Sequence, residues 1–315
     1  MEEMLIGPYI RQKRLDKGWT QEELCDGICS VPTLSRIETC DRTPSSGVLK
    51  ALLEKLGLPT GPFVALLGKD DLAIEKLKKD IRCDKLRLRR AAEPDKAGLR
   101  EQILTKLKDL EELGGEDNRF VRQFLLSTEA GIGGPEGPYP PEKRLEMLLE
   151  AICLTVPRFT VQHIPDFQYS VQEVIVINQI AWTYAMLGDR KTAISIYKRL
   201  LKYIEKYNKN LDKYPRQFGM LAHNCAIDLA LEKRYKEAAA LAEKGQKVCV
   251  EEGDYQFLPG FLAIQAECHF FLGNLEKSKN LYCQAYYIYE VLGDTDNLAI
   301  MKQEMKKYFG LELPH

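Results

Sequence analysis

Apolar residues follow one spacing along this 315-residue chain. They recur at intervals of three and four almost everywhere, and no useful length shows the alternation that a half-buried strand produces. Gly and Pro cluster between the periodic stretches, because helices end at them. The clearest breaks are residues 57–62, 93–95, 131–138, 157–165 and 215. The pattern predicts an all-α fold whose breaks divide the chain into pairs of helices.

The first 67 residues read as five short helices, at roughly 5–16, 20–27, 31–38, 45–56 and 60–67. Gly18 suits the end of the first helix. Thr20 is a good N-cap for the second helix, and Glu22 and Glu23 face the positive end of its dipole. These end signals support the division.

A polar, basic stretch follows. Residues 69–108 carry thirteen Lys and Arg against eight Asp and Glu. Such a run is typical of one or two connecting helices with a solvated face. We therefore expect a first domain at 1–68, a helical linker at 69–115 and a larger domain at 116–315.

Beyond residue 115 the chain is repetitive. Polar turns at 187–193, 231–238 and 272–278 each separate two amphipathic helices, and the small residues Ala193, Ala238 and Ser278 are 45 and 40 positions apart. Small residues let helices approach closely. The pattern resembles the tetratricopeptide repeat, which implies a right-handed stack of helices. Three units span about 173–292, with a divergent pair at 117–160 and a capping helix at 295–308.

A second resemblance covers nearly all of residues 5–67. It is carried by Ile10-Arg11-Gln12-Lys13-Arg14, Gly18-Trp19-Thr20-Gln21-Glu22-Glu23-Leu24 and Leu34-Ser35-Arg36-Ile37-Glu38. These strings resemble the XRE or lambda-repressor-like helix-turn-helix family. The apolar residues Leu24, Ile28, Leu34 and Ile37 then form the inner seam between the second and third helices, which frees the outer face of the third helix for the major groove of DNA.

The resemblance assigns roles to matched positions. Arg14 and Glu38 would form a structural ion pair, and Gln21 would contact a DNA phosphate at the start of the second helix. Arg42, just past the third helix, is also placed for a phosphate. The outer face of the third helix carries Ser30, Pro32, Thr33 and Arg36. Among these, Arg36 is the best candidate for a guanine contact.

The turn at 27–30 departs from the family. It is a residue shorter than in many members, and Val31 and Pro32 stand where polar base-reading side chains are common. Either residue could touch a thymine methyl group. The alternative for the whole outer face is a solvated polar surface without a ligand.

A helix-turn-helix domain followed by tetratricopeptide-like pairs resembles the RRNPP family of Gram-positive quorum-sensing regulators. The resemblance spans the whole chain in architecture, and its specific motifs lie at the N-terminus. It implies a homodimer, a short signalling peptide bound on the concave face of the repeats, and a roughly palindromic operator in double-stranded DNA.

Five polar residues are candidates for binding that peptide. Asn178 and Asn224 lie on the first helices of successive units, 46 residues apart, and resemble the family's asparagines that clamp a peptide backbone. Gln179, Asp228 and Gln265 lie at comparable levels. For each, the alternative is a polar surface residue or a hydrogen bond between helices.

Composition narrows the class of protein. Apolar residues make up 45% and charged residues 29%, with a net charge of -1, which is ordinary for a soluble globular protein. The chain starts without the pattern of a signal peptide, and no run reaches the roughly 18 apolar residues that span a bilayer. We expect a cytoplasmic protein without membrane contact.

The residue types of catalytic and metal sites are dispersed. Nine Cys include no CxxC pair, and Cys25 with Cys29 offers too few thiolates for tetrahedral zinc. The four His stand in no triad or zinc motif. The Gly-rich residues 131–137 follow a helix rather than the strand that a phosphate-binding loop needs. We expect neither an enzyme nor a bound metal or other cofactor.

Two other functions fit the same residues. One is a DNA-binding regulator controlled by a partner protein or a small molecule. The other is a repeat scaffold whose helix-turn-helix serves only for dimerisation or docking and does not bind DNA.

Overall fold

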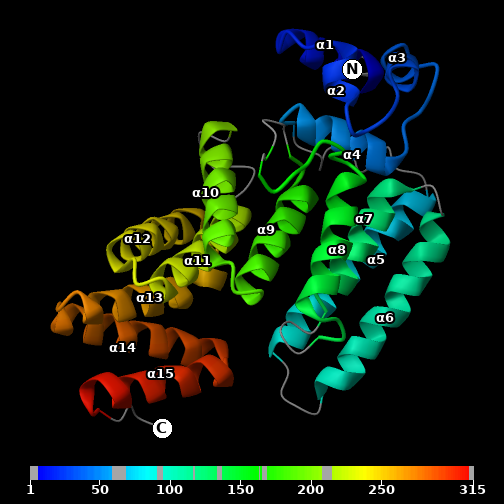
Figure 1. Cartoon of the computed structure of the whole chain (residues 1–315). Coiled ribbons are helices and arrows are strands. Elements are labelled where there is room, and N and C mark those ends of the chain that lie inside the picture. Colours follow the sequence, from blue (N-terminus) through cyan, green and yellow to red (C-terminus); the bar gives the residue numbers. More distant parts are fainter. Residues whose placement is uncertain are drawn as a thin grey trace. The chain divides into compact units, whose positions relative to one another are not determined.

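A computed structural model describes residues 6–58, 69–90, 95–115, 118–132, 137–162, 164, 169–207 and 215–311. Within these residues the regular elements are helices, which confirms the all-α prediction (Figure 1). The chain divides into two compact units, residues 1–180 and 181–315, and the boundary lies inside one helix, α9 (Val171–Met186). The predicted helix at 60–67 lies outside the described residues, and the predicted boundaries at 68 and 115 stay predictions.

The first unit begins with four short helices, called here the head: α1 (Ile6–Asp16), α2 (Gln21–Cys25), α3 (Val31–Glu38) and α4 (Ser46–Lys55). A capping box starts α2, because Thr20 Oγ1 accepts from Glu23 N at 3.1 Å while the Glu23 carboxylate accepts from Thr20 N at 2.7 Å. The core of the head includes Leu24 and Leu34, which are fully buried. The α2 helix ends two residues before the predicted position.

Four helices continue the first unit: α5 (Lys69–Arg90), α6 (Asp95–Gly114), α7 (Arg119–Ala130) and α8 (Pro141–Cys153). The α5, α6 and α7 helices share an apolar cluster that includes Ile81, Ile103 and Leu110, each fully buried. The highly charged stretch after residue 69 therefore has one buried apolar stripe, so it contributes to a packed core as well as a solvated face.

The head is attached to α5 and α7 by polar and apolar contacts. Asp71 on α5 accepts hydrogen bonds from Ser46 N at 3.1 Å and Ser46 Oγ at 2.6 Å, at the N-terminus of α4. Phe120 on α7 packs against the head core, and a Cβ added at Gly47 would lie 2.8 Å from its ring. These contacts make the head part of a larger folded unit.

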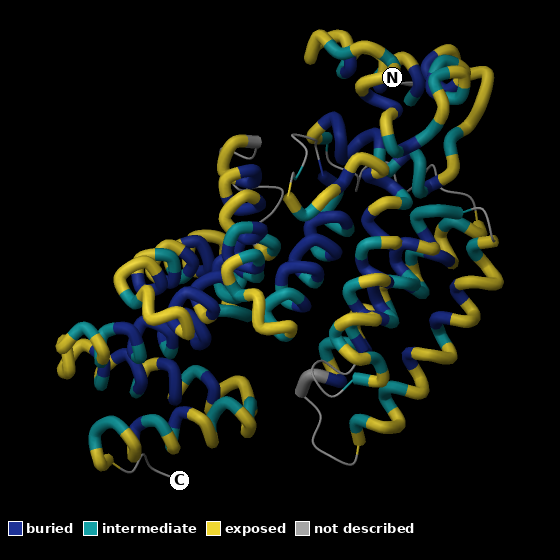
Figure 2. The backbone as a smooth tube through the Cα atoms, viewed as in Figure 1, coloured by how far each residue is buried: buried dark blue, intermediate teal, exposed yellow. Residues whose placement is uncertain are grey.

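The second unit continues from α9 with α10 (Arg190–Tyr207), α11 (Pro215–Leu231), α12 (Tyr235–Glu252), a 3-10 turn (Tyr255–Phe257), α13 (Leu258–Phe271), α14 (Leu275–Leu292) and α15 (Thr295–Phe309). Neighbouring helices in the sequence pack on each other from α11 to α15 (Figure 1). In α10, α12, α14 and α15 buried positions alternate with exposed ones, whereas α11 and α13 are buried or half-buried over most of their length (Figure 2). This is the layered arrangement of helical repeats.

The turn within each repeat has the same backbone geometry. Gly188, Lys233 and Gly273 occupy matching positions with φ values of 87°, 60° and 83°. The next residue in each turn donates its N–H to the carbonyl five residues earlier, at 2.9 Å in all three repeats. A left-handed residue of this kind ends a helix and satisfies its last carbonyl groups.

Small residues allow the helices to approach. Ala193, Ala238 and Ser278, which follow the three turns, are fully buried. Ser278 Oγ also donates to the carbonyl of Ala266 at 2.7 Å, joining α14 to α13. None of the described helices is both long and apolar enough to cross a membrane.

Candidate functional site

The third helix of the head begins with a side-chain cap. Ser30 Oγ accepts from Thr33 N at 3.3 Å and lies 2.9 Å from Thr33 Oγ1. Leu34 and Ile37, on the inner side of α3, are 0% and 1% exposed. The helix is therefore anchored by its apolar side, and its other side faces outward.

Two of the predicted DNA-binding residues on the outward side of α3 are exposed to solvent. Pro32 and Arg36 are exposed, and the Arg36 guanidinium forms no hydrogen bond or ion pair with any described residue. Ser30 and Thr33 are partly committed to the cap, and Val31 is half-buried and packs against the head core. Arg42 is exposed just beyond the helix.

A buried network joins α1, α2 and α3. Arg14 Nε donates to Glu38 Oε1 at 2.7 Å, and Arg14 Nη2 donates to Glu38 Oε2 at 2.9 Å. Gln21 Nε2 donates to Glu38 Oε2 at 2.9 Å. Burial raises the pKa of Glu38, but hydrogen bonds from Arg14 and Gln21 outweigh it and leave that pKa below its usual value. The predicted phosphate contact of Gln21 stays a prediction, since this amide also serves the network.

Two basic side chains hold the turn between α2 and α3. Lys55 Nζ donates to the carbonyl of Asp26 at 2.9 Å, and Arg119 Nη1 donates to the carbonyl of Gly27 at 3.1 Å. Burial lowers the pKa of Lys55 to about 8, against the opposing charges of Asp26 and Glu173. The sequence offered no signal for these contacts, because a Lys at the end of a helix is usually solvated.

The two candidates for peptide binding in the first unit lie on α9. Asn178 is buried, with 6% of its surface exposed. Gln179 is half-buried, and its Nε2 donates to the carbonyl of Ser127 on α7 at 3.0 Å. The same amide packs over Gly131, where a Cβ would collide with it. Gln179 therefore links two helices in this structure.

The three candidates in the second unit lie on α11 and α13. Asp228 is 6% exposed, with its Oδ1 3.8 Å from Arg190 Nε, and burial raises its pKa to about 6. Gln265 is 3% exposed and donates to Gln246 Oε1 on α12 at 2.7 Å. Asn224 is half-buried and interacts with the neighbouring His223 and with Tyr197 on α10.

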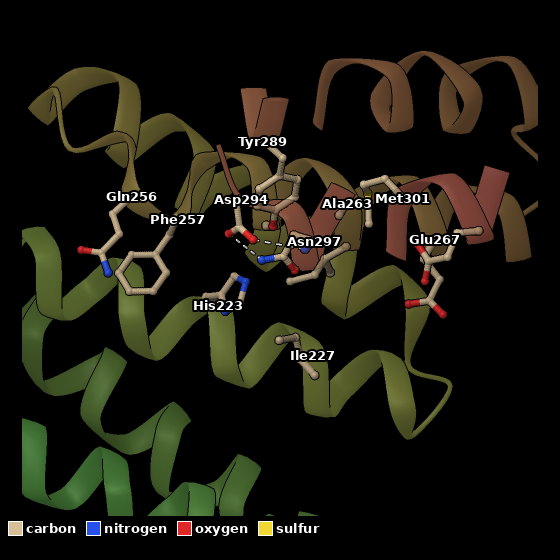
Figure 3. A pocket seen from close by; sticks show the side chains of 13 residues that line it. His223, Ile227, Gln256, Phe257, Ala263, Glu267, Tyr289, Asp294, Asn297 and Met301 are labelled. Carbon is tan, nitrogen blue, oxygen red and sulfur yellow. Dashed lines mark hydrogen bonds between the residues drawn. The ribbon is translucent and has the colours of Figure 1, made fainter. Parts of the chain in front are cut away.

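A cavity of about 320 Å³ opens beside these residues, on the first helices of successive repeats (Figure 3). Its lining comes from α11, the 3-10 turn, α13, the end of α14 and α15. On α11 the lining residues are His223 and Ile227, one position before the predicted Asn224 and Asp228. On α13 they include Gly260, Ala263 and Ile264. Asn224, Asp228 and Gln265 thus lie on the same helices as the lining residues, one position further along the sequence.

His223 is packed tightly into one side of this cavity. Its ring centroid lies 5.5 Å from that of Phe257 and 5.6 Å from that of Phe261. A Cβ at Gly260 would collide with His223 Nε2, so this glycine lets α11 and α13 meet. Burial lowers the pKa of His223 to about 4, and the imidazole is neutral at pH 7.

Sequence reasoning missed the acidic residues of the cavity. Glu267 on α13 and Glu304 on α15 line it, as do Tyr289, Asn297 and Met301. Burial raises the pKa of each glutamate, and the charge of Glu267 raises the pKa of Glu304 further. The sequence predicts the helix at 295–308 only as a cap, although its lining residues Asn297, Met301 and Glu304 recur every three to four positions.

The His, Cys, Asp and Glu residues in the described part of the chain form no group of three or more that could hold a metal ion.

Comparisons with known proteins agree with this organisation. Residues 10–63 match the Helix-turn-helix family model. No curated protein matches the sequence significantly. Among solved structures, Bacillus thuringiensis PlcR in complex with the peptide PapR7 and DNA superposes with a TM-score of 0.59 at 21% identity, covering 94% of this chain and 98% of PlcR.

A second regulator has the same fold. ComR from S. thermophilus, in complex with DNA and its signalling peptide ComS, superposes with a TM-score of 0.52 at 18% identity, covering 97% of this chain and 100% of ComR. The competence regulator ComR from Streptococcus vestibularis, in its apo form, superposes with a TM-score of 0.51 at 18% sequence identity. The match covers 96% of this chain and 98% of that ComR.

The chain therefore contains a helix-turn-helix domain at residues 10–63, followed by a helical repeat region. Its fold over nearly the whole length is that of PlcR and ComR. The resemblance to the RRNPP regulators is confirmed at the level of the fold.

Proposed function

We propose that this protein is a sequence-specific DNA-binding transcription regulator of the cytoplasm, controlled by a short signalling peptide and acting as a homodimer. The observation that carries the proposal is the shared fold with PlcR, a protein solved with both a peptide and DNA, over 94% of this chain. The match of residues 10–63 to a helix-turn-helix family supports the DNA-binding half independently.

The outward side of α3 supports a role in reading bases. Arg36 is exposed and its guanidinium is available for a bidentate hydrogen bond to guanine. Pro32 presents an apolar surface suited to a thymine methyl group. We assign phosphate contacts to Gln21 and Arg42, and supporting contacts to Ser30, Val31 and Thr33, because they flank this surface.

The DNA-binding half is tested by selecting duplexes from a random library with the full-length protein and measuring affinity by fluorescence anisotropy. We expect a preferred sequence whose affinity falls steeply with added salt. Arg36→Ala should weaken binding to that sequence by about tenfold or more, from the usual value of one bidentate base contact. Arg158→Ala removes an exposed Arg far along the chain from the head and should leave affinity unchanged. Binding that lacks sequence preference or salt dependence would favour the scaffold function.

The peptide half is supported by the cavity of about 320 Å³ that residues of α11, α13, α14 and α15 line. Asn178 and Gln179 in the first unit, and Asn224, Asp228 and Gln265 in the second unit, remain proposed peptide contacts. Calorimetry with short peptides encoded near the gene tests it, and Asn224→Ala should weaken binding. If a metabolite or a partner protein gives heat of binding and no such peptide does, that molecule replaces the peptide as the proposed effector. Light scattering at several concentrations tests the homodimer.

A further inference from the structure

The cavity in the second unit is lined by both apolar and polar side chains. The apolar ones include Ile227, Phe257, Ile264 and Met301, and the polar ones include Glu267, Tyr289, Asp294, Asn297 and Glu304. In Figure 3, Tyr289, Asp294 and Asn297 lie together, and Glu267 lies beside Met301. A pocket that is apolar with a few converging polar groups is the usual form of a site for a specific ligand.

Two of the carboxylates that line this pocket form no ion pair in the described part of the chain. Glu267 and Glu304 are half-buried and come from different helices, and neither forms an ion pair within 4.0 Å in the described part of the chain. Their interactions are with the hydroxyls of Tyr308 and Tyr282 and with the more distant charge of Lys307. Two half-buried carboxylates that line one pocket favour a cation from outside.

Two further groups in the pocket have unused hydrogen-bonding capacity. Tyr289 is 9% exposed, lines the cavity, and its hydroxyl makes no hydrogen bond with a described residue (Figure 3). Asn297 donates its Nδ2 to Asp294 Oδ2 at 2.8 Å, which orients the amide and leaves its carbonyl oxygen as an acceptor. The polar groups of the pocket therefore present mainly acceptor oxygens.

We propose that this pocket binds a positively charged group of the effector peptide, either its free amino terminus or a Lys or Arg side chain, with an adjacent apolar side chain against Phe257, Ile264 and Met301. The inference rests on the proposed peptide control. An ammonium or guanidinium group has only donors, which matches carboxylates, a phenolic oxygen and an amide oxygen. With its apolar lining residues and its volume of about 320 Å³, the pocket suits an organic cation with an apolar neighbour better than a bare ion.

The test uses the full-length protein and pools of synthetic heptapeptides, with bound peptides identified by mass spectrometry. Matched pools carry a free or an acetylated amino terminus, and Lys or the uncharged norleucine at each position. We expect retention of peptides with one cation, and comparison of the pools tells an amino terminus from a side chain. Individual hits should bind about tenfold or more tightly than their uncharged analogues, the usual effect of a hydrogen-bonded charge.

Variants then test the named residues. The double variant Glu267→Gln/Glu304→Gln should lose the preference for the cation, and Tyr289→Phe should weaken it while leaving the charges in place. The matched control is Glu276→Gln/Glu290→Gln, which removes two exposed carboxylates from α14. It should bind as the original protein does.

The outcomes separate the two proposals. If both the double variant and Tyr289→Phe keep the full preference for the cation, or if retained peptides show no such preference, the pocket assignment is wrong and peptide control still stands. If the unaltered protein retains no peptide, both proposals fail.

Discussion

At the scale of single residues, the buried pair of Arg14 and Glu38 is the main polar support of the head. Both side chains are buried, at 6% and 3% exposed, and Arg14 also donates to the carbonyl of Trp19 at 2.8 Å. Removing one partner leaves an uncompensated charge inside the protein. We expect Arg14→Met to destabilise the head by about 3–5 kcal/mol, measured by urea unfolding with Trp19 fluorescence in a Trp182→Phe background.

The control lies one position away on the same helix. Lys13 and Asp16 form an exposed ion pair at 3.3 Å, and Lys13→Met should cost no more than about 1 kcal/mol. The loss of unfolding free energy caused by Arg14→Met should also become smaller as the pH is lowered. Because the pKa of Glu38 is lowered in the folded state, the stability it contributes is present above its unfolded pKa and is lost as pH falls. Equal costs for the two variants at pH 7 would contradict this view of the pair.

His223 should make the second unit sensitive to mild acid. Its pKa is about 4 in the fold against 6.5 in the unfolded chain, so only the unfolded state takes up the proton between these values. Stability should fall as pH drops from 6.5 to 4, by at most about 3.5 kcal/mol at about 1.4 kcal/mol for each pH unit. Urea unfolding followed by Trp182 fluorescence at several pH values measures it.

The contribution of His223 is isolated by comparing slopes. His223→Gln should flatten the loss of stability between pH 6.5 and 4, whereas His269→Gln should change it less, because the pKa of His269 is lowered to a smaller extent. The raised pKa of Asp228 acts in the opposite direction, since it favours the folded state at low pH. An unaltered slope in His223→Gln would show that the imidazole is not buried as described.

At the scale of elements, the repeat turns place a lysine where the other two repeats have glycine. Lys233 has a φ of 60°, and its side chain is exposed. A non-glycine residue in this region costs roughly 1 kcal/mol. Lys233→Gly should therefore raise the stability of the second unit by about 0.5–1 kcal/mol, seen as a higher midpoint of thermal unfolding.

The reciprocal change is the control. Gly273 has a φ of 83°, and a Cβ there would meet nothing within 4 Å, so Gly273→Ala tests backbone strain alone. It should destabilise by about 1 kcal/mol. Should both variants lose stability, the turn at Lys233 would be held by side-chain contacts rather than by the left-handed backbone.

The sequence predicts these elements better than it predicts the inward face of the repeats. Turn residues and the small residues Ala193, Ala238 and Ser278 mark the repeat positions, because close helix approach restricts the residue types. The α11 helix is different: Phe218, Leu221, Ala222, Cys225, Ala226 and Leu229 are all buried. A helix buried on several sides has no single apolar stripe. Its sequence therefore cannot tell whether 223 and 227 or 224 and 228 line the cavity.

The same reasoning explains the outcome in the head. Helix α3 has one apolar side, with Leu34 and Ile37, so its outward residues could be identified from spacing. The hydrogen bond from Arg119 to the carbonyl of Gly27 could not be identified from spacing, because 92 residues separate the two partners. Long-range polar contacts leave no periodic trace in the sequence.

At the scale of the whole molecule, the chain carries one tryptophan in each compact unit. Trp19 packs against the head core and Trp182 belongs to the second unit, so each reports on one unit. Phe120 connects α7 to the core of the head, and Phe261 is fully buried in α13. Large apolar side chains such as these stabilise the unit that contains them.

We expect Phe120→Ala to lower the unfolding midpoint seen by Trp19 in a Trp182→Phe background, with a loss of about 1–3 kcal/mol for a half-buried ring. The midpoint seen by Trp182 in a Trp19→Phe background should move less. Phe261→Ala should lower the midpoint seen by Trp182 more than the midpoint seen by Trp19. Phe120→Leu should lower the Trp19 midpoint less than Phe120→Ala does, because leucine keeps an apolar contact. If each variant shifts both midpoints equally, the chain unfolds as one cooperative body and the two units are not independent in stability.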